Sequence, residues 1–156
     1  MEHKVEGYCA IGLDNPKNGI NVGQALRAAA NYGAAFVAAS GKRCKPGETD
    51  ASLAYRNLPF LRPKDLFDLL PYDCVPVAVD LIPGAKSLIE YVHPERAFYI
   101  FGSEDATLGK RILDKCRDVI YIPTIGSMNL AAAVNVVLYD RLAKYSKHRD
   151  FSRSSS

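Results

Sequence analysis

The sequence has no apolar run long enough to cross a membrane, because a helix that spans a bilayer needs about 20 consecutive apolar residues. The first six residues, MEHKVE, are charged and contain no apolar core, so we expect no secretory signal peptide. Cysteine is scattered rather than paired: Cys9, Cys44, Cys74 and Cys116 share no CxxC spacing, and no nearby histidine completes a zinc set. We therefore expect reduced thiols, no metal ion and a cytoplasmic protein.

Three common signatures of catalysis or nucleotide binding are also absent. A P-loop needs the pattern GxxxxGK[ST], whereas the stretch that begins at Gly102 has the wrong spacing and no Ser or Thr after Lys110. No GxGxxG follows an expected strand, so the usual dinucleotide fingerprint is missing. The three histidines are isolated, and they form neither a Ser-His-Asp triad nor a metal cluster.

What remains is a globular composition in 156 residues, enough for one domain with one core. We expect this domain to cover residues 1–150 and a flexible tail to cover residues 151–156. The net charge of +3 is mild, but basic residues gather in two places. Such clusters can follow a phosphate backbone, although charge alone favours a solvated helix end and a frayed tail. The clusters are Lys42, Arg43 and Lys45, and Arg141, Lys144, Lys147, His148, Arg149 and Arg153.

Short apolar runs alternate with segments of helical periodicity along the whole chain. Because the apolar runs are continuous, they are typical of strands that are buried on both faces of a parallel sheet. The expected fold class is therefore α/β, with a parallel sheet covered by helices on both faces. Expected strands are residues 7–13, 34–39, 74–82, 97–101 and 118–122, and expected helices are residues 20–32, 64–70, 108–116 and the segment from residue 130.

The stretch from Ile122 to Leu130 connects the last expected strand to the last helix. Pro123 ends the strand, because proline cannot donate to a sheet ladder. Ser127 lies where a helix N-cap would lie. A strand end, a turn and a helix N-terminus present free N–H groups at one point, and such a place suits a ligand in an α/β sheet.

The last helix is apolar at nearly every position from residue 130 to residue 139, with Asn135 as the exception. A helix that is apolar on all sides is either buried on all sides or shared with another subunit. The sheet of so small a domain covers only one side of such a helix. We therefore expect a homodimer that is built partly on this helix.

Several polar residues follow expected strands or begin the helices after them. In an open α/β sheet, ligands bind at the carboxyl ends of the strands. Position alone therefore makes these residues candidates for the functional site: Asn21, Arg27, Asp80, Ser103, Glu104, Ser127 and Asn129.

Three of these segments together resemble the SpoU/TrmH group of SPOUT methyltransferases. Asn21-x-Gly23-x-x-x-Arg27, closed by Gly33, resembles the first motif of that group. FGSE at residues 101–104 resembles the second motif, and IP at 122–123 with SMNL at 127–130 resembles the third. The motifs occur in the family's order and span nearly the whole chain. The short length and the phrase from SMNL to VNVVLYD resemble the small members, which methylate the ribose of the wobble nucleotide in tRNA.

The resemblance implies a fold, a cofactor and partners. The fold would be a SPOUT fold, whose C-terminal part threads a loop into a deep trefoil knot. S-adenosylmethionine would lie bent inside this knot, and the substrate would be RNA, with tRNA as the expected class, placed across two subunits. The residues that the resemblance places around the cofactor are Val79, Asp80, Leu81, Phe101, Gly102, Ile122, Ser127 and Leu130.

The resemblance also implies methyl transfer from a sulfonium to a ribose 2′-hydroxyl, with roles for five residues. Arg27 would lie at the hydroxyl, either as a base or as a clamp on an RNA phosphate; a guanidinium is not expected to lose its proton in a protein. Asn21 would hold Arg27 or a phosphate, or act as an ordinary N-cap. Glu104 would orient Arg27, or only favour a helix start. Ser127 and Asn129 would contact the cofactor and the RNA.

Two loops depart from the family's pattern. Only three residues separate Pro123 from Ser127, and Leu108-Gly109 comes late after the second motif. Loops altered in this way suit an RNA-binding knotted protein without catalysis. The sequence also leaves open an rRNA 2′-O-methyltransferase and a small nucleotide-binding α/β protein that is unrelated to RNA.

Overall fold

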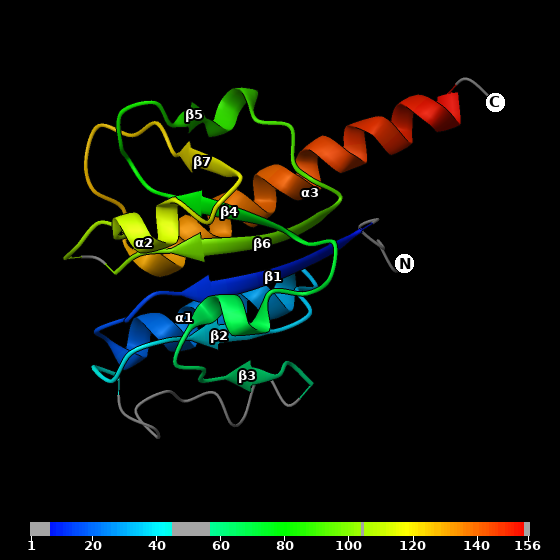
Figure 1. Ribbon diagram of the computed structural model, residues 1–156. Helices are drawn as coiled ribbons and strands as arrows, with labels where there is room; N and C mark the ends of the chain where they lie inside the picture. Colours follow the sequence, from blue (N-terminus) through cyan, green and yellow to red (C-terminus); the bar gives the residue numbers. More distant parts are fainter. Residues whose placement is uncertain (1–6, 45–56, 104, 155–156) are drawn as a thin grey trace.

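The computed structural model describes residues 7–44, 57–103 and 105–154 (Figure 1). Seven strands form one sheet in the order β3-β2-β1-β6-β4-β7-β5, and every neighbouring pair is parallel. This confirms the α/β class with a parallel sheet. The strands are β1 (Tyr8–Leu13), β2 (Val37–Ala39), β3 (Phe60–Leu61), β4 (Val75–Val79), β5 (Lys86–Ser87), β6 (Arg96–Phe101) and β7 (Asp118–Tyr121).

Helices cover both faces of the sheet, as the continuous apolar strands predict (Figure 1). The long helices α1 (Gly19–Asn31) and α3 (Leu130–Ser154) pack together on one face. The opposite face carries two short helices, the 3-10 helix η1 (Leu66–Leu69) and α2 (Lys110–Leu113). A further 3-10 turn, η2 (Leu88–Glu90), follows β5.

The two central strands divide their side chains between these layers. β1 and β6 pair along their whole length, from Tyr8 beside Arg96 to Leu13 beside Phe101. Successive side chains on a strand point to opposite faces. Ile11 and Tyr99 therefore pack in the core under α1 and α3, whereas their neighbours pack under η1 and α2. The buried residues of the second core include Ala10, Leu66, Phe98, Ile100 and Leu108.

Two predicted helices are shorter in the structure. The helix predicted over residues 108–116 is only α2, which cannot begin earlier because its N-cap Gly109 is extended, with a φ of −70° and a ψ of 160°. After α2, the Cys116 N–H bonds to the Leu113 carbonyl in a turn. The helix predicted over residues 64–70 is the 3-10 helix η1, which begins after Asp65, whose side chain accepts from the Phe67 N–H at 3.0 Å.

The sheet differs from its prediction mainly at its edges. The predicted strand 34–39 begins at Val37, because the Ala34 N–H closes the end of α1 by bonding to the Ala29 carbonyl. The predicted strand 74–82 ends at Val79. The outermost strands, β3 and β5, have two residues each, and their sequences carry no apolar pattern that would predict them.

The start of α3 corrects the expected N-cap. The helix begins at Leu130, and the Asn129 side chain accepts from the Ala132 N–H at 2.8 Å, so Asn129 caps the helix and Ser127 does not. Both residue types are good caps, and the sequence does not distinguish two positions this close. At its other end α3 runs through residues 151–154, where the sequence predicted a flexible tail.

A buried polar network joins α3 to the loop that precedes β6. Arg141 is 2% exposed, and its guanidinium donates to the carbonyls of Pro94 and Glu95 at 2.6 and 2.7 Å and to the Tyr99 hydroxyl at 3.0 Å. The guanidinium also lies over the Tyr145 ring, 4.8 Å from its centroid. Arg141 is therefore a core residue and not part of an exposed basic cluster, which corrects the reading from charge alone.

His93 and Lys144 extend this network. The two ring nitrogens of His93 lie 2.7 Å from the Tyr99 hydroxyl and 2.7 Å from an Asp140 carboxylate oxygen. Lys144 donates to the carbonyls of Leu88 and Tyr91 and pairs with Asp140. Burial lowers the pKa of His93 to about 4, although Asp140 opposes this shift, so the imidazole is neutral at physiological pH.

The four cysteines are free, and Cys9, Cys44 and Cys74 are buried in the cores. Burial raises the pKa of Cys116, which is partly exposed, to about 11, and this keeps its thiol protonated. Within the described ranges, no group of three or more His, Cys, Asp or Glu side chains is arranged to hold a metal ion. In the same part of the chain, no helix combines the length and the apolar character that a membrane span requires.

Candidate functional site

A cavity of about 460 Å³ opens at the carboxyl edge of the sheet. It lies where β4, β6 and β7 end, because these parallel strands are neighbours and the loops after them meet at one edge. The volume is within the range of about 300–1,000 Å³ that is typical of small-molecule sites. The lining residues are 79–81, 101–103, 105–107, 121, 122, 124, 126–128, 130 and 133.

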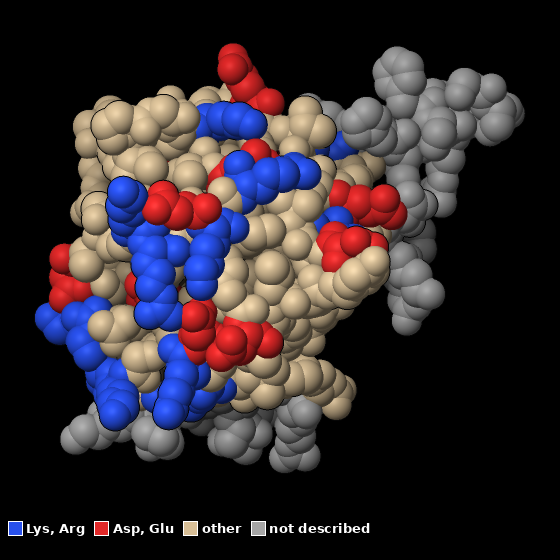
Figure 2. All heavy atoms as spheres, viewed as in Figure 1, with Lys and Arg blue, Asp and Glu red and all other residues tan. Residues whose placement is uncertain are grey.

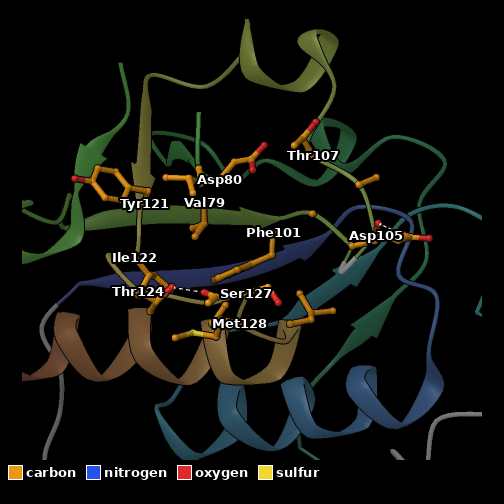
Figure 3. A pocket seen from close by; sticks show the side chains of 17 residues that line it. Val79, Asp80, Phe101, Asp105, Thr107, Tyr121, Ile122, Thr124, Ser127 and Met128 are labelled. Carbon is orange, nitrogen blue, oxygen red and sulfur yellow. Dashed lines mark hydrogen bonds between the residues drawn. The ribbon is translucent and has the colours of Figure 1, made fainter. Parts of the chain in front are cut away.

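All eight residues that the sequence analysis placed around a cofactor line this cavity: Val79, Asp80, Leu81, Phe101, Gly102, Ile122, Ser127 and Leu130. In Figure 3, Asp80 and Thr107 lie on one side and Ser127 and Met128 on the other, with Phe101 between them. Thr107, Tyr121 and Met128 also line the cavity, and none of them was predicted to do so. Their only signal is their place: Thr107 lies in the loop after β6, Tyr121 ends β7, and Met128 lies within the third motif.

The walls are mainly apolar side chains and loop backbone. Val79, Phe101 and Leu130 supply apolar surface, and the chain turns away at Gly102, where an added Cβ would come within 3.2 Å of the Ala106 carbonyl oxygen. Such walls bind a flat aromatic group by contact and by backbone hydrogen bonds, without charged side chains.

Asp80 fixes one end of the wall that follows β6. Its carboxylate oxygen Oδ2 accepts from the Leu108 N–H at 2.9 Å. Leu108 is 2% exposed and anchors this end of the loop in the second core. The structure thus gives Asp80 a role in shaping the cavity.

Asp105 fixes the other end of the same wall. Its carboxylate forms a two-point pair with the Arg43 guanidinium, with N···O distances of 2.8 and 3.1 Å, and accepts from the Ser103 hydroxyl at 2.8 Å. The Arg43 guanidinium and the Ser103 hydroxyl hold the pKa of Asp105 well below its usual range. The carboxylate is therefore ionised throughout the physiological pH range.

The third wall is the segment between β7 and α3. The Thr124 hydroxyl donates to the Gly126 carbonyl at 2.7 Å and closes a small turn (Figure 3). Ser127 follows this turn, is exposed and lines the cavity. Asn129 does not line the cavity, because its side chain is used to cap α3.

The structure does not gather all five residues that were expected to act on the substrate. Of the four that the structure describes, only Ser127 lines the cavity. Asn21 and Arg27 lie on α1, with Arg27 exposed, and the N-cap of α1 is Asn18, whose side chain accepts from the Ile20 N–H at 2.8 Å. Asn21 is therefore not the N-cap, which corrects one of its two expected roles. Glu104 lies outside the described residues.

A larger cavity of about 740 Å³ lies beside β5 and the start of β7. Its charged groups neutralise one another: Lys86 and Arg117 both pair with Asp118, which also accepts from the Tyr91 hydroxyl at 2.7 Å. None of the predicted site residues is among the residues that line this cavity, and the carboxyl ends of the central strands lie elsewhere. The smaller cavity is the better candidate for a functional site for that reason.

A family model described as the SpoU rRNA Methylase family matches residues 8–139. The chain belongs to the SpoU rRNA Methylase family. The match includes all three segments that build the cavity, and S-adenosylmethionine is the cofactor of this family. A search among curated protein sequences finds no match for this SpoU chain.

Solved structures share the fold of this SpoU domain. AviRb from Streptomyces viridochromogenes, a SpoU methyltransferase in complex with AdoMet, is 22% identical with a TM-score of 0.79, covering 89% of this chain and 58% of its own. The A. aeolicus TrmH/SpoU tRNA modifying enzyme is 17% identical with a TM-score of 0.79, covering 95% and 82%. A structure that concerns the 2-OH methylation of C/U34 on tRNA is 24% identical with a TM-score of 0.77, covering 90% and 98%. The chain thus spans about three fifths of AviRb.

Proposed function

We propose that this SpoU protein is an S-adenosylmethionine-dependent RNA methyltransferase that transfers a methyl group to a ribose 2′-hydroxyl, with the wobble nucleotide of tRNA as its substrate. The observation that carries the proposal is that the second and third family segments, together with the end of β4, line one cavity at the carboxyl edge of the sheet. The cavity's position also agrees with the general placement of ligands in α/β sheets.

The residues of the cavity fit the cofactor. The apolar side chains of Val79, Phe101 and Leu130 provide contact surface for an adenine, and the backbone at Gly102 and Ile122 provides hydrogen-bonding groups for its edge and for a ribose. The carboxylates of Asp105 and Asp80 in the wall are already occupied by Arg43 and by the Leu108 N–H. The cavity therefore needs no further charged partner to receive a ligand of this kind.

When bound, S-adenosylmethionine supplies a methyl group on a sulfonium, which is a good leaving group. The protein's tasks are then alignment, which can supply about 7–11 kcal/mol of the barrier, and removal of a weakly acidic proton. Arg27 grips an RNA phosphate or the ribose and fixes the 2′-oxygen, and Asn21 supports it from the same helix. Ser127 orients groups at the mouth of the cavity, and Asn129 and Glu104 act on the RNA side.

The charge distribution supports RNA as the partner. Figure 2 shows Lys and Arg side chains gathered on the side of the molecule where η1 and α2 lie. Lys64, Lys110 and Arg111 are exposed there. A basic surface of this kind attracts a phosphate backbone and makes its binding dependent on salt.

A similar structure supports tRNA as the substrate. This chain covers 98% of the protein in the structure concerned with C/U34 on tRNA. An rRNA substrate is the first alternative, and a knotted RNA-binding protein without catalysis is the second.

We also infer a trefoil knot in the C-terminal part, a cytoplasmic location and a homodimer. Exposed apolar side chains on α1, α3 and the segment between β7 and α3 support the dimer: Ile20, Tyr139 and Ile125 are 69%, 60% and 110% exposed. Sedimentation analysis tests the dimer: a single species at the monomer mass across micromolar concentrations contradicts it.

The decisive test is incubation of the purified protein with labelled S-adenosylmethionine and total tRNA, followed by nucleoside analysis. We expect a 2′-O-methylated pyrimidine from position 34. Label in rRNA but not in tRNA supports the rRNA methyltransferase. Cofactor binding without transfer to either RNA, or no calorimetric heat with millimolar cofactor, supports the protein without catalysis.

The role of Arg27 has its own test. The variant Arg27→Ala should lose methyl transfer by at least about a hundredfold, since positioning a reacting group typically contributes that much or more. Its affinity for S-adenosylmethionine should stay within about twofold of wild type. Arg96→Ala is the matched control, because Arg96 is also exposed but lies at the amino edge of the sheet. Wild-type transfer by Arg27→Ala contradicts the role.

A further inference from the structure

The wall of the cavity that follows β6 has little packing of its own. Asp105, Ala106 and Thr107 all line the cavity and are all exposed. Phe101, before this segment, and Leu108, at its end, are both buried in the hydrophobic cores, whereas residues 105–107 between them are not. Among these exposed residues, Asp105 is held by polar contacts.

Arg43 supplies those contacts from a different strand end. It follows β2, and its guanidinium meets both carboxylate oxygens of Asp105 in a two-point geometry. Exposed ion pairs usually contribute little, but a bidentate pair that is part of a network is an exception. The Ser103 hydroxyl donates to the same carboxylate and completes the network on the cavity side.

The same guanidinium holds the turn that follows β1. Arg43 Nη2 and Nε donate to the Asn15 carbonyl at 2.7 and 3.2 Å. Asn15 has a positive φ of 49°, and an added Cβ at Gly41 would lie 2.1 Å from its side-chain oxygen, so this turn is closely fitted to the loop that carries Arg43. Asp14 and Ser40 add a hydrogen bond of 3.1 Å between the two loops.

One side chain thus connects the ends of β1, β2 and β6. The turn after β1 leads through the N-cap Asn18 into α1, the helix that carries Arg27. The loop after β6 forms a wall of the cavity. Arg43 is therefore the structural link between the segment that faces the methyl donor and the segment that starts the substrate helix.

We propose that Arg43 is a positioning residue that braces the wall at Asp105 and thereby sets the affinity of the cavity for S-adenosylmethionine. This inference rests on the proposed function, which identifies the ligand of the cavity as S-adenosylmethionine. It adds a residue outside the three motifs, on a loop that the sequence analysis read only as part of a small basic cluster. The guanidinium acts through Asp105 and the backbone, and it does not need to contact the methyl donor.

The test compares Arg43→Ala, Arg43→Lys, Asp105→Asn and the double variant Arg43→Ala/Asp105→Asn. We expect Arg43→Ala and Asp105→Asn each to raise the calorimetric Kd for S-adenosylmethionine about five- to tenfold, and the double variant to be no worse than either. Arg43→Lys should recover part of the loss. In steady state, KM for S-adenosylmethionine should rise while kcat and KM for tRNA stay near wild type.

Lys86→Ala is the matched control, because it breaks an exposed ion pair with Asp118 away from this cavity and should leave the cofactor Kd unchanged. An unchanged Kd in Arg43→Ala overturns the proposal. A second result would also overturn it: KM for tRNA rises, and tRNA binding depends less on salt, in Arg43→Ala but not in Asp105→Asn. That pattern would show that Arg43 contacts an RNA phosphate.

Amide hydrogen exchange without any ligand separates this proposal from the proposed function. The brace predicts faster exchange at residues 105–108 in Arg43→Ala than in wild type, with an unchanged thermal unfolding midpoint. If the wild-type protein binds no S-adenosylmethionine, the proposed function fails. The exchange rates alone then show whether Arg43 holds the wall in place at Asp105. Equal exchange rates in the two proteins overturn it.

Discussion

Two arginines, Arg43 and Arg141, show how differently the two edges of the sheet use the same side chain. Arg141 lies at the amino edge and is 2% exposed, and its guanidinium donates hydrogen bonds to two backbone carbonyls and a buried hydroxyl. The side chain of Arg43 lies at the carboxyl edge, is 35% exposed and pairs with a carboxylate whose side chain is 45% exposed. Removal of a buried guanidinium leaves its acceptors unpaired in the core, whereas breaking an exposed pair returns both groups to water. The amino edge therefore holds the fold together, and the carboxyl edge is free to carry a ligand site.

The strongest test of this contrast is Arg141→Met, which keeps much of the volume but removes the guanidinium. It leaves the carbonyls of Pro94 and Glu95 and the Tyr99 hydroxyl without their donor. Because hydrogen bonds to charged groups contribute about 1.5–3 kcal/mol each and three are lost, the free energy of unfolding should fall by at least about 4 kcal/mol in urea denaturation. Arg111→Met, an exposed ion-pair control, should change it by less than about 0.5 kcal/mol. Equal losses in the two variants contradict the contrast.

The buried network should also make stability depend on pH. The His93 pKa is about 4 in the folded protein, because burial outweighs Asp140, against about 6.5 when unfolded. Between these values the unfolded state binds a proton that the folded state does not, so stability falls as pH falls from about 6.5 to about 4 and levels off below that. The free energy of unfolding that is lost over this pH range is about 3 kcal/mol.

Comparison with His93→Gln isolates this dependence. Other charged and titratable groups face the imidazole, namely Tyr91, Tyr99, Asp140, Arg141 and Lys144, and they remain in the variant. We expect the wild-type protein to lose stability between pH 6.5 and pH 4 and the variant to lose much less. Parallel curves for the two proteins, measured by denaturant unfolding at each pH, count against a buried neutral His93.

The smallest expected effect concerns the start of α3, where the two candidate caps can be compared directly. Asn129→Ala should lower the free energy of unfolding by about 1 kcal/mol, because it removes the acceptor of the Ala132 N–H. Ser127→Ala should change it by less than about 0.5 kcal/mol, because Ser127 lies before the helix. The reverse order, in thermal or urea unfolding, would restore Ser127 as the cap.

The sequence predicts the layers and the cavity well, for a physical reason. Buried parallel strands must be continuous apolar runs, and the loops after neighbouring strands must meet at one edge, so Phe101 and Ile122 could be placed together from order alone. The resemblance then named the same loops as a cofactor site. Apolar runs and family motifs are local patterns, which the sequence displays directly.

What the sequence did not predict depends on contacts between distant residues. Arg141 stands in a run of charges near the C-terminus, and only its partners at Pro94 and Glu95 show that it is buried. Tyr99 lies in an apolar strand, and nothing local reveals that its hydroxyl joins His93 to the helix. The short edge strands were missed because two residues carry no period to detect.

These short edges limit how the protein can associate with others. A long exposed strand offers a row of free N–H and C=O groups on which another chain can align and extend the sheet. Here the outermost strands, β3 and β5, expose only two residues each, and β5 carries Lys86. Extension of the sheet across a subunit boundary is therefore disfavoured, which leaves the helical layer of α1 and α3 as the surface for the proposed homodimer.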